Sequence, residues 1–252
     1  AHTINIDLTS TPYSEKEVDF LINKCKVKYI KIASMDLNNL NFLKYIGKKK
    51  IPVVLSTGMG SMNEIKLAID TLKNNGSSDI CVLHCVSIYP TPINDMNLNN
   101  ILKLKQELNG VSIGFSDHSI GNECAMASIA MGACLIEKHF TLDNTKIGMD
   151  NQMAMEPKML GDMILKCNKV FNALGDHDRI ISKSENKQKK IMRRSVVAKR
   201  DLEKNHIIKL NDLVLKRPGT GVPADKINNL VGKKLTKRVK AGFLIKFKDI
   251  KK

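Results

Sequence analysis

The chain has 252 residues, which at roughly 150 residues per domain predicts one large domain or two unequal ones. Its content of 42% hydrophobic and 26% charged residues excludes a disordered or fibrous protein. No apolar run approaches the ~20 residues that span a bilayer, and the opening residues lack a basic-then-apolar signal pattern. We therefore expect no membrane partner.

The chain is strongly basic, with 41 Lys and Arg against 25 Asp and Glu and a net charge of +16. That balance invites a nucleic-acid interpretation. However, the lysines are dispersed, aromatic residues make up 4% and Trp is absent, so there is little on which bases could stack. We therefore expect no nucleic-acid partner. The electrostatic field of the positive net charge should instead favour small anionic substrates.

The six cysteines show neither paired nor zinc-like spacing. They are Cys25, Cys81, Cys85, Cys124, Cys134 and Cys167. Cys81 and Cys85 lie in one apolar run, where buried free thiols are the expected structure. Six unpaired thiols indicate a reducing compartment, and hence the cytoplasm.

Short apolar runs rich in β-branched residues alternate with longer helical patterns as far as residue 174. The runs, which we predict to be strands, are residues 4–8, 29–33, 53–56, 80–84, 111–115 and 135–138. Ser14 with Glu17 and Ser61 with Glu64 have the spacing of capping boxes at helix starts. Later helices are predicted over 98–108, 122–131 and 158–174.

Alternating strands and helices of this kind predict a parallel α/β sheet. Six strands in about 175 residues give roughly 30 residues per unit, the repeat of a TIM (β/α)8 barrel, of which about six units are present. An open doubly wound sheet has the same periodicity, but no GxGxxG follows any strand.

The pattern of residues changes after the last predicted helix. We expect a βα-barrel domain over residues 1–176, a polar Lys-rich linker over 177–193, and a small all-β domain over 194–252. Within the last of these, residues 206–213 resemble residues 243–250 at an offset of 37, which predicts an internal pseudo-twofold repeat.

Polar residues follow the predicted strands, where the active site of a βα barrel lies. His118 and His139 end consecutive strands, and two converging neutral imidazoles suit a divalent ion such as Mn or Zn. The alternative is a structural pair of hydrogen-bonded histidines. Lys31 with Ser34 and Ser56 would suit a phosphate or carboxylate, with ordinary strand-end capping as the alternative.

Five motifs in order along the chain resemble the sialic acid synthase family of N-acetylneuraminate and related nonulosonate synthases. They are Lys31-Ile32-Ala33-Ser34, Ser56-Thr57-Gly58-Met59, Tyr89-Pro90-Thr91-Pro92, Ser116-Asp117-His118-Ser119 and Glu137-Lys138-His139-Phe140. The C-terminal part, with Arg194-Ser195 and Lys216-Arg217-Pro218-Gly219-Thr220-Gly221, resembles the antifreeze-like SAF domain of that family. The resemblance covers essentially the whole chain.

This resemblance implies that phosphoenolpyruvate condenses with an open-chain N-acyl hexosamine to a nine-carbon 2-keto acid and phosphate. It implies that His118 and His139 bind the Mn or Mg that polarises the sugar aldehyde. Phosphoenolpyruvate would be held by Thr11, Lys31, Ser34, Ser56 and Ser116, and the sugar side of the site would be formed by Ser87, Tyr89, Glu137 and Asp150. The residues expected to serve catalysis itself are Lys31, His118, Glu137 and His139.

Arg217 carries a further implication of the resemblance. In this family the SAF-domain arginine reaches the site of the neighbouring subunit and contacts the N-acyl group of the sugar. The resemblance therefore implies a domain-swapped homodimer.

The chain departs from the family pattern at its beginning. Family members open with a strand carrying an acidic residue and an Asn-His pair, then a strand ending in Lys-x-Gln, and neither is present. The resemblance thus implies that two βα units are missing. With them are missing a glutamate expected to act as the catalytic base and a lysine expected to bind phosphoenolpyruvate. We expect a truncated chain without catalytic competence by itself. Asn151 and Ser87 also differ from the usual family residues, which leaves the acceptor sugar open.

Two other functions stay open. A non-catalytic module derived from the synthase, for glycan binding or dimerisation, would have no need of a metal at His118 and His139. Another phosphoenolpyruvate- or metal-dependent aldolase on the same barrel would not depend on Arg217. The acceptor is N-acetylmannosamine, its phosphate or a diacetamido trideoxyhexose, and the sequence does not choose among them.

Overall fold

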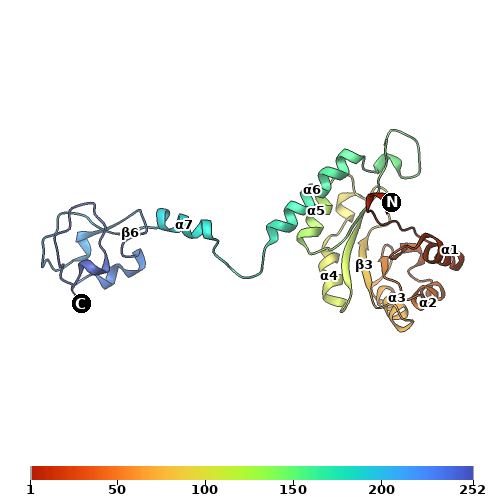
Figure 1. The fold of residues 1–252 in the computed structure, drawn as a ribbon, viewed down its shortest axis with the longest axis horizontal. Coiled ribbons are helices and arrows are strands. Elements are labelled where there is room, and N and C mark those ends of the chain that lie inside the picture. Colours follow the sequence, from red (N-terminus) through yellow and green to blue (C-terminus); the bar gives the residue numbers. More distant parts are fainter. Residues whose placement is uncertain (1, 252) are drawn as a thin grey trace. The chain divides into compact units, whose positions relative to one another are not determined.

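The computed structural model describes residues 2–251 and divides the chain into two compact units. The first extends to Gly175 and the second begins at Asp176. Figure 1 shows a parallel α/β sheet with its helices in the first unit and a small β domain in the second. None of the helices in residues 2–251 is both long and apolar enough to cross a membrane.

The first unit is built on a five-stranded parallel sheet, an arc of a βα barrel. Its strands, in spatial as well as chain order, are β1 (Ile30–Ile32), β2 (Val53–Ser56), β3 (Ile80–Cys85), β4 (Ser112–Asp117) and β5 (Ile136–Lys138). Every residue of β1 and β2 is buried, as expected for a parallel sheet covered on both faces. The parallel direction brings all five carboxyl ends to one edge.

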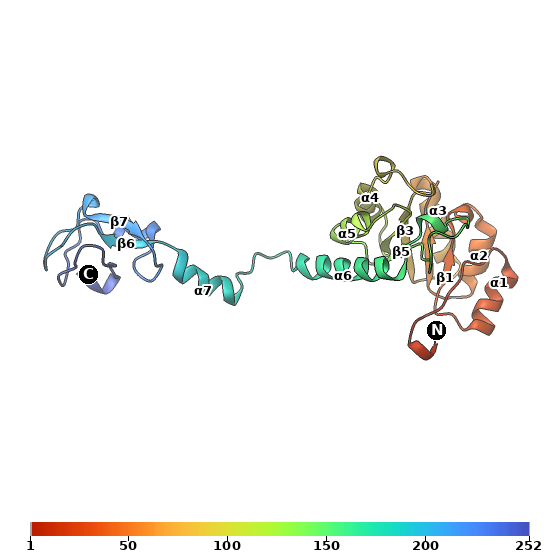
Figure 2. The same ribbon diagram turned by 90° about the horizontal axis from the view of Figure 1, so that it is seen from above.

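Helices connect these strands and pack beside one another, α2 on α3 and α5 on α6. The helices are α1 (Glu15–Phe20), α2 (Leu40–Lys48), α3 (Met62–Asn74), α4 (Asn99–Glu107), α5 (Glu123–Ala130) and α6 (Pro157–Leu174). A π-turn spans Leu21–Cys25, and 3-10 turns span Ser34–Asp36, Ile93–Asp95 and Asn151–Met153. Figure 2 shows these helices around the sheet from a second direction.

The two predicted helix starts differ in detail. Ser61 and Glu64 form both hydrogen bonds of a capping box at α3. At α1 the Ser14 hydroxyl accepts from the Glu17 amide, but the Glu17 carboxylate accepts from the amide of Tyr13 instead. The local signature therefore places both starts correctly and completes the box at one of them.

The strand predicted over residues 4–8 is wrong. A 3-10 turn covers His2–Ile4, Asn5 is a turn residue with a φ of 54°, and residues 6–10 have no strand partner in the described part of the chain. The Thr9 hydroxyl donates to the Tyr29 carbonyl and Lys28 pairs with Asp7, so the segment runs beside the start of β1. Its apolar side chains are more than half exposed, and an apolar alternation that buries no face does not stabilise a strand.

The second unit contains the antiparallel pair β6 (Ser195–Ala198) and β7 (Leu213–Lys216) around its own apolar core. Its 3-10 turns span Leu210–Asp212, Ala224–Asn229 and Phe247–Asp249. The range 177–193, expected to be a linker, contains helix α7 (Lys183–Met192), which begins at the cap residue Ser182. The described linker is thus partly helical.

The internal repeat of the second unit exists in the backbone as well as in the sequence. The Asp212 carboxylate accepts from the Lys209 amide, and the Asp249 carboxylate accepts from the Lys246 amide. Both aspartates are buried, and both close a 3-10 turn of the same backbone conformation. The two halves therefore use the same turn at the offset of 37 residues in the sequence.

Candidate active site

A polar pocket of about 330 Å³ lies at the carboxyl ends of the strands. Its lining includes eight residues predicted from the sequence, namely Lys31, Ser34, Ser56, Ser87, Tyr89, Ser116, His118 and Glu137. They come from all five strands or the loops that follow them, because parallel strands deliver their ends to one edge. The structure thus brings most of the predicted residues together.

Lys31 is the buried cation of this pocket. It lies on β1, and its ammonium group donates to the Ser56 hydroxyl at 2.7 Å and to the Ile32 carbonyl at 3.2 Å. The Glu137 carboxylate is 3.5 Å away. A lysine held in this way by neutral acceptors and one carboxylate is suited to receive an anionic ligand.

Ser34 and Ser87 line the same pocket on either side of Gly58. The Ser34 hydroxyl accepts from the Gly58 amide at 2.9 Å. A Cβ on Gly58 would lie 2.1 Å from the Ser87 hydroxyl oxygen, so a larger residue there would displace that hydroxyl. The Ser87 hydroxyl is buried and has no hydrogen-bond partner among the described residues, which leaves it available to a ligand.

His118 and His139 converge beside the pocket, with ring centroids 5.3 Å apart. Tyr89 lies against both, at 4.2 Å from the His118 ring and 5.8 Å from the His139 ring. His118 Nδ1 is 2.7 Å from the Val86 carbonyl, which can only accept. Nδ1 therefore carries the proton, and Nε2 keeps the lone pair in the neutral ring.

The surroundings of His118 and His139 shift the pKa values of the two imidazoles in opposite directions. Burial opposes the charged form of His118, but interactions with Cys85 and the Val86 carbonyl outweigh it and raise its pKa. Burial, followed by the nearby His118, lowers the pKa of His139. Burial likewise opposes the thiolate of Cys85, yet His118 and Ser34 lower the pKa of that thiol.

Four predicted residues do not line the main pocket, namely Thr11, His139, Asp150 and Arg217. His139 and Asp150 line a neighbouring hollow of about 450 Å³, with His139 Nδ1 3.9 Å from Asp150 Oδ2. Thr11 lines a more apolar hollow of about 490 Å³ near the start of the chain. Arg217 belongs to the second unit, where its guanidinium lies 3.4 Å from Met192 Sδ.

The sequence prediction missed Cys85 as a pocket residue. Its position could have been found from the two-residue alternation of a strand, since Cys85 precedes Ser87 by two. Three bulkier lining residues, Tyr13, Met35 and Met59, come from loops, where no such period exists. They supply the apolar part of the wall.

The donor set at the histidines fits a divalent ion. The tautomer of His118 is fixed by a carbonyl, as is usual for metal-binding imidazoles. Among residues 2–251, no group of three or more His, Cys, Asp or Glu side chains is arranged to hold a metal. The two imidazoles are one fewer than the three protein ligands of the usual catalytic zinc site, so an ion here would take its other ligands from water and substrate.

Fold and site together define a βα-barrel protein with a polar pocket at the carboxyl edge of its sheet, followed by a small β domain. Residues 1–179 match the NeuB family model and residues 193–251 match the SAF domain model. The chain therefore belongs to the NeuB family, the sialic acid synthase family, with a C-terminal SAF domain.

Individual relatives agree with this assignment. The chain is 39% identical to the N,N'-diacetyllegionaminic acid synthase of Campylobacter jejuni, covering 98% of this chain and 74% of that protein. It is 35% identical to the enzyme of the same name from Legionella pneumophila, over 99% of this chain and 71% of the relative. The crystal structure of N-acetylneuraminic acid synthetase from Leptospira borgpetersenii superposes with a TM-score of 0.70 at 34% identity, over 74% of this chain and 65% of that one.

Proposed function

We propose that the chain belongs to a synthase that condenses phosphoenolpyruvate, an N-acyl hexosamine and water to a nine-carbon 2-keto acid and phosphate. The observation that carries the proposal is the position of the buried Lys31 cluster and the His118–His139 pair at the same edge of the sheet. The Lys31 cluster suits an anion, and the histidine pair suits a divalent ion that faces a carbonyl oxygen. Membership of the NeuB family supports the same reaction.

The residues of the chain have separate tasks in this proposal. Lys31, Ser56 and Ser116 would bind the charged oxygens of phosphoenolpyruvate, and Ser34 would add a hydroxyl donor. Together with Thr11 these four residues form the proposed phosphoenolpyruvate set, although Thr11 lies in the neighbouring hollow. Ser87 would offer its hydroxyl on the sugar side of the pocket. Holding both reactants at one edge offsets much of the entropy cost of joining them.

The proposed metal ligands are His118 and His139, and Mn and Mg are the candidate ions. When bound, the ion supplies Lewis-acid polarisation of the sugar carbonyl oxygen. Tyr89 packs against His118 and limits the ways in which that ring can turn. Glu137 and Asp150 would face the sugar, since their carboxylates lie on the pocket and on the adjoining hollow.

We propose a diacetamido trideoxyhexose of the legionaminic type as the first acceptor to test. Two relatives, at 39% and 35% identity, carry the name N,N'-diacetyllegionaminic acid synthase. N-acetylmannosamine and its phosphate are the competing acceptors.

The test is acceptor-dependent phosphate release from phosphoenolpyruvate with Mn. The assay would use the chain as printed and a version preceded by the first two βα units of the Campylobacter jejuni relative. Release with one acceptor, lost in His118→Ala, supports the synthase. No release by either version with any of the three acceptors would overturn it and favour the non-catalytic module.

The proposed homodimer has its own test. If Arg217 completes the partner's sugar site, Arg217→Ala should raise the KM for the sugar at least tenfold and leave the KM for phosphoenolpyruvate unchanged. Sedimentation equilibrium should then give a dimer for the wild type. A monomer with normal sugar affinity would contradict this part of the proposal.

A further inference from the structure

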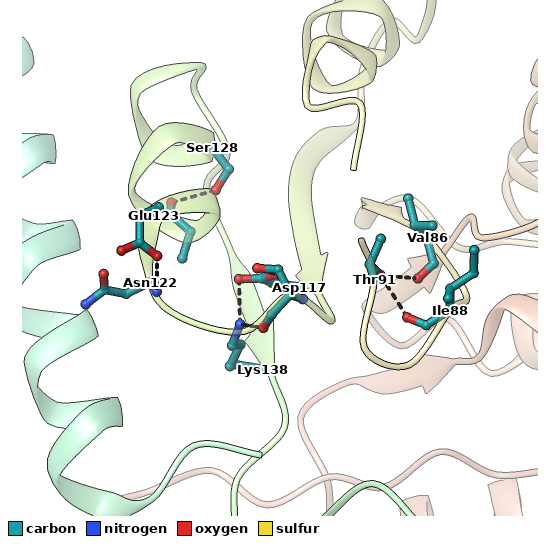
Figure 3. A network of polar contacts seen from close by, with 10 residues as sticks. Val86, Ile88, Thr91, Asp117, Asn122, Glu123, Ser128 and Lys138 are labelled. Atoms are coloured by element: carbon teal, nitrogen blue, oxygen red, sulfur yellow. Dashed lines mark hydrogen bonds and ion pairs between the residues drawn. The ribbon is translucent and has the colours of Figure 1, made fainter. Parts of the chain in front are cut away.

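A buried ion pair joins the ends of β4 and β5 beside the candidate site. Lys138 Nζ lies 2.8 Å from Asp117 Oδ2, and the two side chains are 3% and 0% exposed. Neither residue lines the pocket, whereas Ser116, Glu137 and His118 do. Side chains alternate between the faces of a strand, so Asp117 and Lys138 belong to the opposite face (Figure 3).

The pair is fully supplied with hydrogen bonds. Asp117 Oδ1 accepts from the Ser119 amide at 2.8 Å and from the Ser119 hydroxyl at 2.7 Å. The Lys138 ammonium group also donates to the Ser119 carbonyl. Both charges are therefore compensated, which a buried ion pair requires.

This pair is the last register contact between the two strands. Asp117 lies opposite Lys138 in the ladder, and His118 and His139 are the next residues along each chain. The histidines thus lie just past the point where backbone pairing ends. The ion pair is the closest direct link between the strands that carry them.

Apart from the packing of Tyr89 against both rings and of the two rings against each other, the other contacts hold each histidine separately. His118 donates to the Val86 carbonyl, and its own carbonyl accepts from the Thr91 amide at 3.0 Å. Thr91 in turn donates to the Ile88 carbonyl, as Figure 3 shows. The His139 carbonyl accepts from the Met155 amide at 2.8 Å. None of these contacts connects one histidine to the other.

We propose that Asp117 and Lys138 are positioning residues that set the separation of His118 and His139 for a shared divalent ion. This inference rests on the proposed metal-binding role of the two histidines. A stabilising role alone explains the pair poorly, because a buried ion pair often contributes little net stability over neutral residues of similar volume. A pair that orients ligands acts instead on metal affinity.

The test uses Co²⁺ as a spectroscopic probe in the full chain, with Asp117→Asn, Lys138→Met and the double variant. Each single variant leaves a buried charge unpaired, and we expect both to melt at a lower temperature. The double variant removes both charges, so its melting temperature should return close to that of the wild type. Its Co²⁺ affinity should nevertheless stay roughly tenfold weaker, with an altered visible absorption spectrum.

The outcomes are distinguishable. If the double variant is stable and binds Co²⁺ with wild-type affinity and spectrum, the pair is structural and the inference is wrong. If the wild type binds Co²⁺ no better than His118→Ala, the metal site itself fails and the inference fails with it. Asp212→Asn, which alters a buried carboxylate of the second unit, is the matched control and should leave Co²⁺ binding unchanged.

Discussion

The Ser116 hydroxyl donates a 2.6 Å hydrogen bond to the carboxylate of Glu137, its register partner on the neighbouring strand. The other carboxylate oxygen lies 3.5 Å from the ammonium group of Lys31. Glu137 therefore occupies two groups that we propose for phosphoenolpyruvate. The negative charge of Glu137 therefore competes with an anionic ligand for Ser116 and Lys31.

This competition predicts opposite effects of Glu137→Gln on binding and turnover. Removing the negative charge should tighten phosphoenolpyruvate binding severalfold, because like charges repel in a partly buried site. Turnover should fall if the carboxylate steadies the sugar. Calorimetric titration gives the affinity and phosphate release gives the rate. Glu107→Gln, at a half-buried carboxylate outside the pocket that is bound by Lys66 and Lys103, should change neither, and equal weakening by both variants would refute the prediction.

Lys31→Met should weaken phosphoenolpyruvate binding by a factor of ten or more. The variant keeps the length of the side chain and removes the buried cation, and a charge-assisted hydrogen bond contributes about 1.5–3 kcal/mol. The measurement is again calorimetric. Lys28→Met is the matched control, since Lys28 is exposed and pairs with Asp7 outside the pocket. Unchanged affinity in Lys31→Met would remove the basis of the proposed anion site.

Gly58→Ala should damage the pocket with little effect on the rest of the fold. The added Cβ would lie 2.1 Å from the Ser87 hydroxyl oxygen and 2.9 Å from that of Ser34, so both hydroxyls must move. We expect at least a tenfold loss of phosphoenolpyruvate affinity. In Gly161→Ala nothing lies within 4 Å of the new Cβ, and this helical position should gain roughly 1 kcal/mol of stability. Normal affinity in Gly58→Ala would show that the Ser34 hydroxyl does not bind phosphoenolpyruvate.

Cys81 and Cys134 should differ sharply in reactivity although their sulfurs are 4.0 Å apart. Burial, with a smaller contribution from Cys134, raises the pKa of the Cys81 thiol to about 12. At pH 8 it stays protonated and unreactive, because the thiolate is the nucleophile. Cys134 is exposed and should be alkylated by iodoacetamide first, as peptide mass mapping over time would show. Faster labelling of Cys81 would contradict the assigned burial.

The second unit should lose stability in acid through Asp212. Burial alone would raise the pKa of this carboxyl, but hydrogen bonds from His206, the Lys209 amide and Arg200 lower it well below its usual range. A lowered folded pKa stabilises the fold above the unfolded value of about 3.9, and that contribution is lost as the pH falls below it. Asp212→Asn should therefore cost about 2 kcal/mol at pH 7 and flatten the dependence on pH.

The measurement for Asp212 must follow the second unit by itself. All four tyrosines, Tyr13, Tyr29, Tyr45 and Tyr89, lie in the first unit, and the chain has no Trp. Hydrogen-exchange mass spectrometry of peptides from residues 195–250 at pH 7 and pH 3.5 resolves the second unit instead. Asp225→Asn, at an exposed carboxylate, is the control and should exchange like the wild type.

Much of the first unit follows from the sequence because its signals are local and repeated. The run at β2 (Val53–Ser56) is wholly buried, and such continuous apolar runs mark strands of parallel sheets. The sequence patterns do not predict helix α2 (Leu40–Lys48), although the Asn39 side chain caps it. Helix α7 (Lys183–Met192) falls in the predicted linker because it buries no residue, and without an apolar stripe only the cap at Ser182 indicates a helix.

The candidate site could be predicted only as a set of strand-end residues. The rule that parallel strands end together places Lys31, Ser56 and His118 at one edge. It says nothing of loop residues such as Met59, or of the hollow in which Asp150 lies, since loops have no fixed period. The pairing of Asp117 with Lys138 depends on the register between strands that bring together residues 21 positions apart, which no local pattern contains.

In β4 and β5, residues that line the pocket alternate with residues that form the buried ion pair, so the register of the two strands fixes both sets at once. Ser116 and His118 serve the pocket, while Asp117 between them holds the neighbouring strand. Deleting one residue within β4 would exchange the two faces of that strand, so that Asp117 would point into the pocket and the neighbouring Ser116 away from it. A deletion within β5 would do the same to Lys138 and Glu137. We therefore expect the candidate site to tolerate point substitutions and changes in loop length, and to be lost on an insertion or deletion within these strands.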